Sequence, residues 1–228
     1  MNRPENKDPV SGGKMVQGAD KEGSDRFAAP LGSSTGGRLN FGRGAADVTI
    51  HADSATGDLY RARFEGPQPR VWAEGGVVTI EYPRTFHPFD WRKRGAEVTL
   101  NALIPWDIEI HDGASRLTAD LRGLELHSLE VSGGASRVEV MLTQPSGTVP
   151  VRILGGASNV AIHRPKGVAA HLRVGGGATN LAVDERRFGA VGGEVSLQSP
   201  DYESASDRYD ITITGGASNL TVDARCPA

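Results

Sequence analysis

The sequence predicts an all-β fold in which short strands stack as the rungs of a parallel β-solenoid. A corner such as Gly-Gly-Ala-Ser-Asn at 155–159 recurs along the chain, with alternating apolar residues on both sides. The glycines that precede the corner alanine, from Gly113 through Gly134 and Gly156 to Gly177, stand 21, 22 and 21 residues apart. No segment keeps the apolar period of a helix, so helix is not expected.

A repeat of about 21 residues cannot bury an apolar face alone, but it can when it stacks on its neighbours. Each repeat therefore predicts one rung, with a rise of about 4.8 Å between rungs, and parallel pairing between successive rungs. Equivalent residues then form inward columns. The corner alanines form one, and the residues three positions later form the next: Leu117, Val138, Val160, Leu181 and Leu220.

The corner itself is predicted to be structural. Its glycines supply a positive φ or a close backbone approach, and its serines and asparagines hydrogen-bond up the stack as polar ladders do. The residues assigned to this role are Gly113, Gly134, Gly156, Gly177, Gly216, Ser115, Ser136, Ser158, Ser218, Asn159, Asn180 and Asn219.

The order of segments predicts one domain over 36–228, preceded by a disordered polar tail over 1–35. Alternating apolar residues predict strand, turn and strand over 37–50, and hairpin strands over 58–82. The repeats then run over 96–225. An antiparallel sandwich is the competing fold, and it explains 58–100 well but gives no reason for one corner sequence to recur in register.

Two interruptions of the repeat are candidate binding regions. The loop 83–94 is aromatic and basic, so it either binds an anionic partner or caps one end of the core; its residues of interest are Arg84, Phe86, Phe89, Trp91, Arg92 and Arg94. The insertion 185–210 follows the last regular repeat before Gly216. It holds one divergent copy at Gly192-Gly193 and a polar loop.

A polar column is also predicted seven residues after each repeat glycine: His51, Asp120, Met141, His163, Asp184 and Asp223. If the rungs stack in chain order, His163 and Asp184 are neighbours, whereas Asp120 and His163 are too far apart to share a metal ion. A solvated rim explains the column better than a metal site. We therefore expect no metal ion and no cofactor.

Composition excludes several function classes. A formal net charge of −3 argues against a general nucleic-acid binder. The single cysteine, Cys226, excludes an internal disulfide. An apolar run long enough to span a membrane and a secretory signal are both missing from the printed sequence. We expect a cytoplasmic protein without direct membrane insertion, and we leave open an association with the cell envelope through a partner.

Segments that read Gly-Gly-Ala-Ser, then Asn or Arg, then alternating apolar residues begin at Gly133, Gly155 and Gly215. They resemble the repeats of a bacterial family known as "putative adhesin" or "toastrack" β-strand-repeat domains, and the resemblance covers most of 37–225. It implies a single-stranded, right-handed β-solenoid. Relatives of this kind occur in cell-envelope stress-response and surface proteins, often beside membrane segments. The resemblance implies no catalytic residues.

The sequence therefore predicts a non-enzymatic scaffold or protein-interaction module, with a protein partner or self-association through uncovered end rungs. A link to envelope-stress signalling is part of this hypothesis, and a small-molecule ligand stays undetermined. Two other classes remain open. A carbohydrate-active β-helix would need paired carboxylates along a groove, and a ligand sensor would bind through 58–94.

Overall fold

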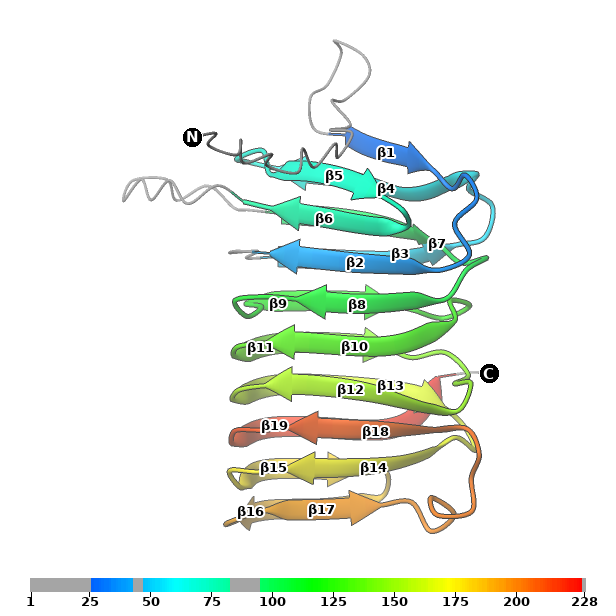
Figure 1. Cartoon of the computed structure of the whole chain (residues 1–228). Helices are drawn as coiled ribbons and strands as arrows, with labels where there is room; N and C mark the ends of the chain where they lie inside the picture. The colour runs from blue at the N-terminus through cyan, green and yellow to red at the C-terminus, as the bar shows by residue number, and fades with distance from the viewer. Residues whose placement is uncertain (1–25, 43–46, 83–94, 227–228) are drawn as a thin grey trace, which may run out of the picture.

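The computed structural model describes residues 26–42, 47–82 and 95–226, and every regular element within them is a strand (Figure 1). The strands of the N-terminal part are β1 (Arg26–Pro30), β2 (Gly37–Gly42), β3 (Asp47–Asp53), β4 (Asp58–Glu65), β5 (Arg70–Glu74), β6 (Val77–Glu81) and β7 (Gly95–Asn101). The repeat strands are β8 (Trp106–Ile110), β9 (Arg116–Asp120), β10 (Leu126–Ser132), β11 (Ala135–Met141), β12 (Thr148–Leu154), β13 (Ala157–Pro165), β14 (Ala169–Val174) and β15 (Ala178–Val183). The last strands are β16 (Arg186–Val191), β17 (Val195–Gln198), β18 (Arg208–Ile213) and β19 (Ala217–Cys226).

These strands form two sheets, and each rung contributes one strand to each sheet (Figure 1). Among the described residues, sheet A has the order β1-β4-β7-β3-β9-β11-β13-β19-β15-β16, and sheet B has the order β5-β6-β2-β8-β10-β12-β18-β14-β17. Successive repeats pair in parallel, as β8 with β10 and β11 with β13. The predicted all-β stack is confirmed, whereas its handedness stays a prediction.

The core lies between the two sheets and consists of the predicted apolar columns. Alternation along each strand sends one set of side chains inward, because successive residues of a strand point to opposite faces. The second predicted column is continuous through the strand registers and is at most 3% exposed: Leu117, Val138, Val160, Leu220 and Leu181, in spatial order.

The order of the rungs differs from the order of the repeats. The rung β18–β19, which carries Gly216, lies between β12–β13 and β14–β15 rather than after them. The rung β2–β3 likewise lies between β6–β7 and β8–β9. The expectation of stacking in chain order is therefore wrong at both ends. At the C-terminal end the corners at 155–159 and 215–219 are identical in sequence, so the corner does not specify which neighbour a rung pairs with.

Antiparallel strands form both ends of the described stack. Strand β16 runs antiparallel to β15 and β17 antiparallel to β14, so the copy at Gly192-Gly193 is a reversed rung and not a parallel one. At the other end β4 and β5 run antiparallel to β7 and β6. The predicted N-terminal hairpin region is present, and the outermost described strands of each sheet are antiparallel to their neighbours.

The predicted disordered tail, 1–35, extends too far along the chain, because part of it forms a strand. Residues Arg26–Pro30 form β1, which pairs antiparallel with β4. Phe27 packs edge-on against Phe64, with ring centroids 5.4 Å apart. These five residues therefore gain apolar contacts and ladder hydrogen bonds that the polar composition of 1–35 as a whole did not indicate. The rest of the predicted tail, 1–25, lies outside the described residues.

Candidate functional site

The predicted corner residues line one edge of the stack and form a backbone ladder. The carbonyl oxygens of Gly134, Gly156 and Gly216 accept hydrogen bonds from the alanine N–H groups of neighbouring rungs at 3.0–3.1 Å. The shallow groove along this edge has a volume of about 650 Å³ and is lined by glycine, alanine and serine, with Asp112 at one end. Such a lining offers short side chains and satisfied backbone groups. We therefore assign it a structural role.

The asparagines of the corner form the expected ladder, with one change of order. Asn180 Nδ2 donates to Asn219 Oδ1 at 2.9 Å, and Asn219 Nδ2 donates to Asn159 Oδ1 at 2.9 Å. All three residues have φ between 50° and 52°, a left-handed conformation that asparagine tolerates better than most residues. Asn219 stands in the middle because its rung is the interposed one. Among the serines, Ser136 Oγ donates to Ser115 O at 3.1 Å.

The aromatic and basic loop residues Arg84, Phe86, Phe89, Trp91, Arg92 and Arg94 lie outside the described residues. Their predicted role in binding stays a prediction.

The polar column exists on sheet A, but its order is corrected by the interposed rung. His163 pairs in register with Asp223, so the expected adjacency of His163 and Asp184 is wrong. Farther along the column, the Arg122 side chain donates two hydrogen bonds to Asp120, at 2.8 and 2.6 Å. These bonds hold the pKa of the Asp120 carboxyl below its usual value.

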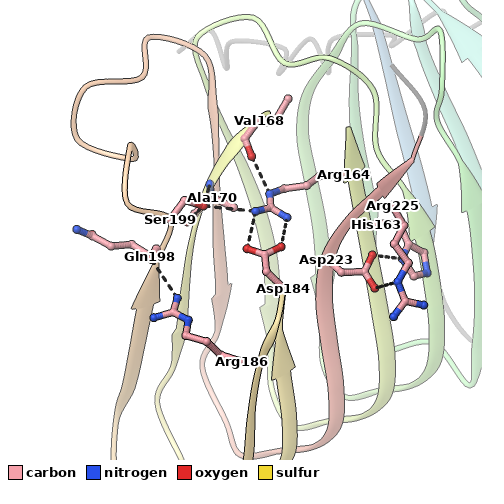
Figure 2. Close-up of polar contacts among 10 residues, drawn as sticks. All are labelled: His163, Arg164, Val168, Ala170, Asp184, Arg186, Gln198, Ser199, Asp223 and Arg225. Atoms are coloured by element: carbon pink, nitrogen blue, oxygen red, sulfur yellow. Dashed lines mark hydrogen bonds and ion pairs between the residues drawn. The ribbon is translucent and has the colours of Figure 1, made fainter. Parts of the chain in front are cut away.

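The strongest polar cluster of the described residues lies where the insertion 185–210 meets the stack (Figure 2). A cleft of about 710 Å³ opens there, and we call it the insertion cleft. Its lining residues are Arg164, Gly167, Val168, Asp184, Glu185, Arg186, Gln198, Ser199, Pro200, Asp201, Asp223, Ala224 and Arg225. The insertion was one of the two regions where the sequence predicted a specific site.

Arg164 is the buried centre of this cluster, with 5% of its side chain exposed. Its two terminal nitrogens donate to the two carboxylate oxygens of Asp184 at 2.7 and 2.8 Å, and its Nε donates to Val168 O at 2.8 Å. The Oγ of Ser199 lies 3.4 Å from Nη2 and accepts from Ala170 N at 3.0 Å. Because a buried guanidinium needs several acceptors, Arg164 holds three segments around itself, through Val168, Asp184 and Ser199 (Figure 2).

A second cluster lies on the other side of β19. His163 Nδ1 is 2.8 Å from Asp223 Oδ1, and an ionised carboxylate can only accept, so Nδ1 carries the proton. Asp223 Oδ2 lies 2.9 Å from Arg225 Nε as an ion pair without hydrogen-bond geometry. Only 6% of the Asp223 side chain is exposed, against 74% for Arg225. The carboxylate is thus held in the wall, and the guanidinium faces solvent at the rim.

The loop 199–207 above the cleft is fixed by Arg208 and Tyr202. Arg208 Nη1 donates to Tyr202 O at 2.8 Å, and its guanidinium lies 4.7 Å from the centre of the Tyr202 ring. The same ring packs edge-on against His171. Burial, followed by the nearby Asp210 carboxylate, raises the pKa of Tyr202. Arg186 Nη2 donates to Gln198 O at 3.1 Å within the insertion, whereas Arg208 Nε donates to Thr148 Oγ1 of β12 at 3.1 Å and so ties the insertion to the stack.

Sequence reasoning did not single out Arg164 or Ser199. A signal for Arg164 was present, because it occupies an inward position of β13 two residues after buried Ile162, where the alternation calls for an apolar residue. The residues that the structure describes hold no group of three or more His, Cys, Asp or Glu side chains placed to bind a metal ion. They also include no helix long and apolar enough to cross a membrane.

Comparison with known proteins places this architecture. Residues 20–163 match a family model described as the N-terminal domain of toast_rack, DUF2154. A crystal structure of a "putative cell adhesion protein" from Clostridium sporogenes ATCC 15579 is 18% identical with a TM-score of 0.68, over 87% of this chain and 98% of that one, and so shares its fold. A "putative adhesin" from Bacteroides fragilis NCTC 9343 is 10% identical over 86% of this chain and 96% of that one, and its TM-score of 0.38 is too low to support an argument.

No curated protein matches the sequence. The family model, in contrast, covers the N-terminal strands and the repeats as far as His163, which is more than half of the chain. The chain therefore belongs to the family of toast_rack N-terminal domains, DUF2154.

Proposed function

We propose that this protein is a non-enzymatic β-solenoid scaffold that binds a protein partner at the insertion cleft. The observation that supports this most is the contrast between the rim and the interior of the cleft. Glu185, Arg186, Asp201 and Arg225 are exposed around the opening, while Arg164 is held by three strong hydrogen bonds beneath them. Because Arg164 holds the backbone beneath the rim in place, little conformational entropy is lost when the rim side chains bind a partner.

Binding at the side of the stack is favoured over growth at its ends. Three of the four outermost described strands carry exposed charged residues, Arg26 in β1, Arg70 in β5 and Arg187 in β16, and β1 ends at Pro30, whereas β17 (Val195–Gln198) has none. Charged residues and proline on edge strands discourage the addition of further strands. A partner with both basic and acidic side chains complements the two carboxylates and two guanidiniums of the rim. The description of the Clostridium sporogenes protein as a "putative cell adhesion protein" agrees with a binding role.

Affinity capture with matched charge reversals tests this proposal. The full chain and a Glu185→Lys/Asp201→Lys variant are used as baits, and Glu139→Lys, an exposed site on β11 away from the cleft, is the control. We expect one protein to be retained by the wild type and by Glu139→Lys, and its capture by the double variant to fall at least tenfold. Equal capture by all three baits, or capture of no protein that discriminates between them, contradicts the proposal.

A further inference from the structure

The last rung in the sequence fills an interior slot. This C-terminal rung, β18 with β19, lies between β12–β13 on one side and β14–β15 on the other (Figure 1). It pairs in parallel with all four strands. Five of its side chains are at most 1% exposed: Tyr209, Ile211, Ile213, Leu220 and Val222. The slot is therefore a binding site for two strands, both of whose walls are built from residues earlier in the chain.

The two walls are also joined to each other without the rung. Arg164 belongs to β13 and Asp184 directly follows β15, while β19 lies between these strands in sheet A. Their bidentate ion pair, at 2.7 and 2.8 Å, therefore spans the interposed strand (Figure 2). Arg164 further binds Val168 O in the connection between the walls. These contacts set the width of the slot, whichever chain supplies the strands inside it.

The rung and the walls recognise each other through specific polar pairs. Asn219 bridges Asn159 and Asn180. Asp223 accepts from His163, and Asp210 accepts from Arg173 at 2.8 and 3.1 Å. These bonds link the rung to the walls and do not involve 200–206. A rung from another copy of the chain would form all of them.

The loop 199–207 is the covalent connection between the rung and the strands before it. Strands β17 and β18 lie on opposite sides of β14 in sheet B, so this loop crosses over the beginning of β14. The loop is held by the Arg208 hydrogen bonds to Tyr202 O and Ala205 O and by the contact of Tyr202 with His171. Insertion of the rung into the slot of its own chain thus depends on this loop, none of whose residues belongs to the hydrophobic core.

We propose that the slot also accepts the C-terminal rung of a second copy, so that two chains exchange β18–β19 and form a dimer. The exchange is reciprocal and closes with two-fold symmetry, and every strand pairing of the monomer is kept. In this dimer both chains contribute residues to each insertion cleft: Arg164 and Asp184 come from one copy, and Asp223 and Arg225 come from the other. This inference is independent of the proposed partner binding.

Shortening the loop tests the exchange. Deleting 201–206 leaves Pro200 and Asp207 between Ser199 and Arg208, and three peptide links reach at most about 10 Å. The path has to cross two strand spacings, about 9.6 Å, and also rise over the connection into β14. We expect the shortened chain to elute as a folded dimer by size exclusion with light scattering. The Tyr202→Ala variant, which loses loop contacts but keeps the full reach, is expected to elute like the wild type.

A disulfide shows whether the dimer is formed by exchange. The shortened chain also carries Asn159→Cys, Asn219→Cys and Cys226→Ser, because neighbouring parallel strands bring residues 159 and 219 within bonding distance. A covalent dimer on a non-reducing gel supports the proposal. A folded shortened monomer, or a dimer whose disulfide stays within each chain, overturns it.

If the shortened chain does not fold, the same three substitutions in the full-length chain decide the question. This chain is refolded at increasing protein concentration and then oxidised. The fraction of covalent dimer is expected to rise at least fivefold over a hundredfold range of concentration. Disulfides that remain within single chains at every concentration overturn the proposal.

Discussion

Arg164 shows how one residue can set the geometry of a region that the repeat pattern leaves undefined. It replaces an inward apolar residue with a charge that is only 5% exposed. Burying such a charge is costly unless its hydrogen bonds are satisfied, and its partners come from the turn after β13, the end of β15 and the end of β17. The hydrogen bonds of Arg164 are therefore satisfied only when these three segments lie together around its side chain.

Tyr60 is a second buried polar residue, and it gives a prediction about pH. Its side chain is fully buried, its hydroxyl has no hydrogen-bond partner among the described residues, and burial raises its pKa to about 12. Tyr60→Phe should therefore stabilise the protein by about 1 kcal/mol at neutral pH, because a buried unpaired hydroxyl is costly. Urea unfolding followed by circular dichroism measures this difference.

The same pair of proteins reports the titration of Tyr60. The pKa of Tyr60 in the folded protein lies above the ordinary value of 10.0. The folded state therefore keeps its stability relative to the unfolded chain below about pH 10 and loses stability as pH rises towards about 12, because the tyrosine of the unfolded chain ionises first. The advantage of Tyr60→Phe over the wild type should widen across that range. A constant difference between pH 8 and pH 12 contradicts this assignment.

At the scale of the element, the two adjacent glycines of the corner at 155–159 differ in how closely the neighbouring rung approaches them. A Cβ on Gly155 would lie 2.5 Å from the backbone oxygen of Gly133, so only glycine allows the neighbouring rung to come this close. A Cβ on Gly156 would meet nothing nearer than 3.7 Å. Since backbone atoms of a stacked rung cannot move aside, Gly155 is required at this corner, and the predicted close approach or positive φ at Gly156 is wrong. Gly177 fits the prediction, because it has φ of 81° and its Cβ would lie 2.8 Å from Val191 O.

This contrast predicts different effects of one methyl group. Gly155→Ala should destabilise the protein by about 2 kcal/mol, as overpacking against fixed neighbours does. Gly156→Ala should change stability by less than about 0.5 kcal/mol. Chemical denaturation of the two variants side by side tests this, and equal effects would show that close approach does not explain the Gly-Gly pair.

At the scale of the whole molecule, the first and last repeat copies lie inside the stack and antiparallel strands lie outside it. Both ends of the described stack therefore present antiparallel edge strands in place of parallel repeat strands. The interposed rungs β2–β3 and β18–β19 also bring residues distant in sequence into contact. Arg208 Nε, for example, donates to Thr148 Oγ1 at 3.1 Å. The C-terminal rung β18–β19 makes such contacts on both of its sides, whereas the N-terminal strand β1 is an edge strand, so the two should differ in how much they contribute to stability.

Truncation from the two ends should therefore have unequal effects. A chain that begins at Leu31 loses the edge strand β1, and its melting temperature should fall by only a few degrees. A chain that ends at Asp207 loses the interior rung with its buried core residues, and its cooperative melting transition should disappear. Thermal unfolding followed by circular dichroism distinguishes these outcomes, and a cooperative transition of the C-terminally truncated chain near the wild-type temperature contradicts the second.

The sequence by itself determined the all-β stack, the inward columns, the ladder of corner asparagines and the insertion as a place of interest. Each of these follows from alternation or from the spacing of one corner motif, which are local properties of the chain. The order of the rungs was decided only by the tertiary structure. The corner Gly-Gly-Ala-Ser-Asn is identical at 155–159 and 215–219, so the motif cannot specify its own neighbour.

The insertion cleft depended on the tertiary structure for the same reason. Its residues come from β13, from the end of β15, from the insertion and from β19, and Asp223 and Arg225 join the others only when β18–β19 enters the slot. The pairing of His163 with Asp223, and of Arg164 with Asp184 across the interposed strand, follows from that order. A periodic pattern predicts which residues share a column, but long-range pairing decides which of them touch.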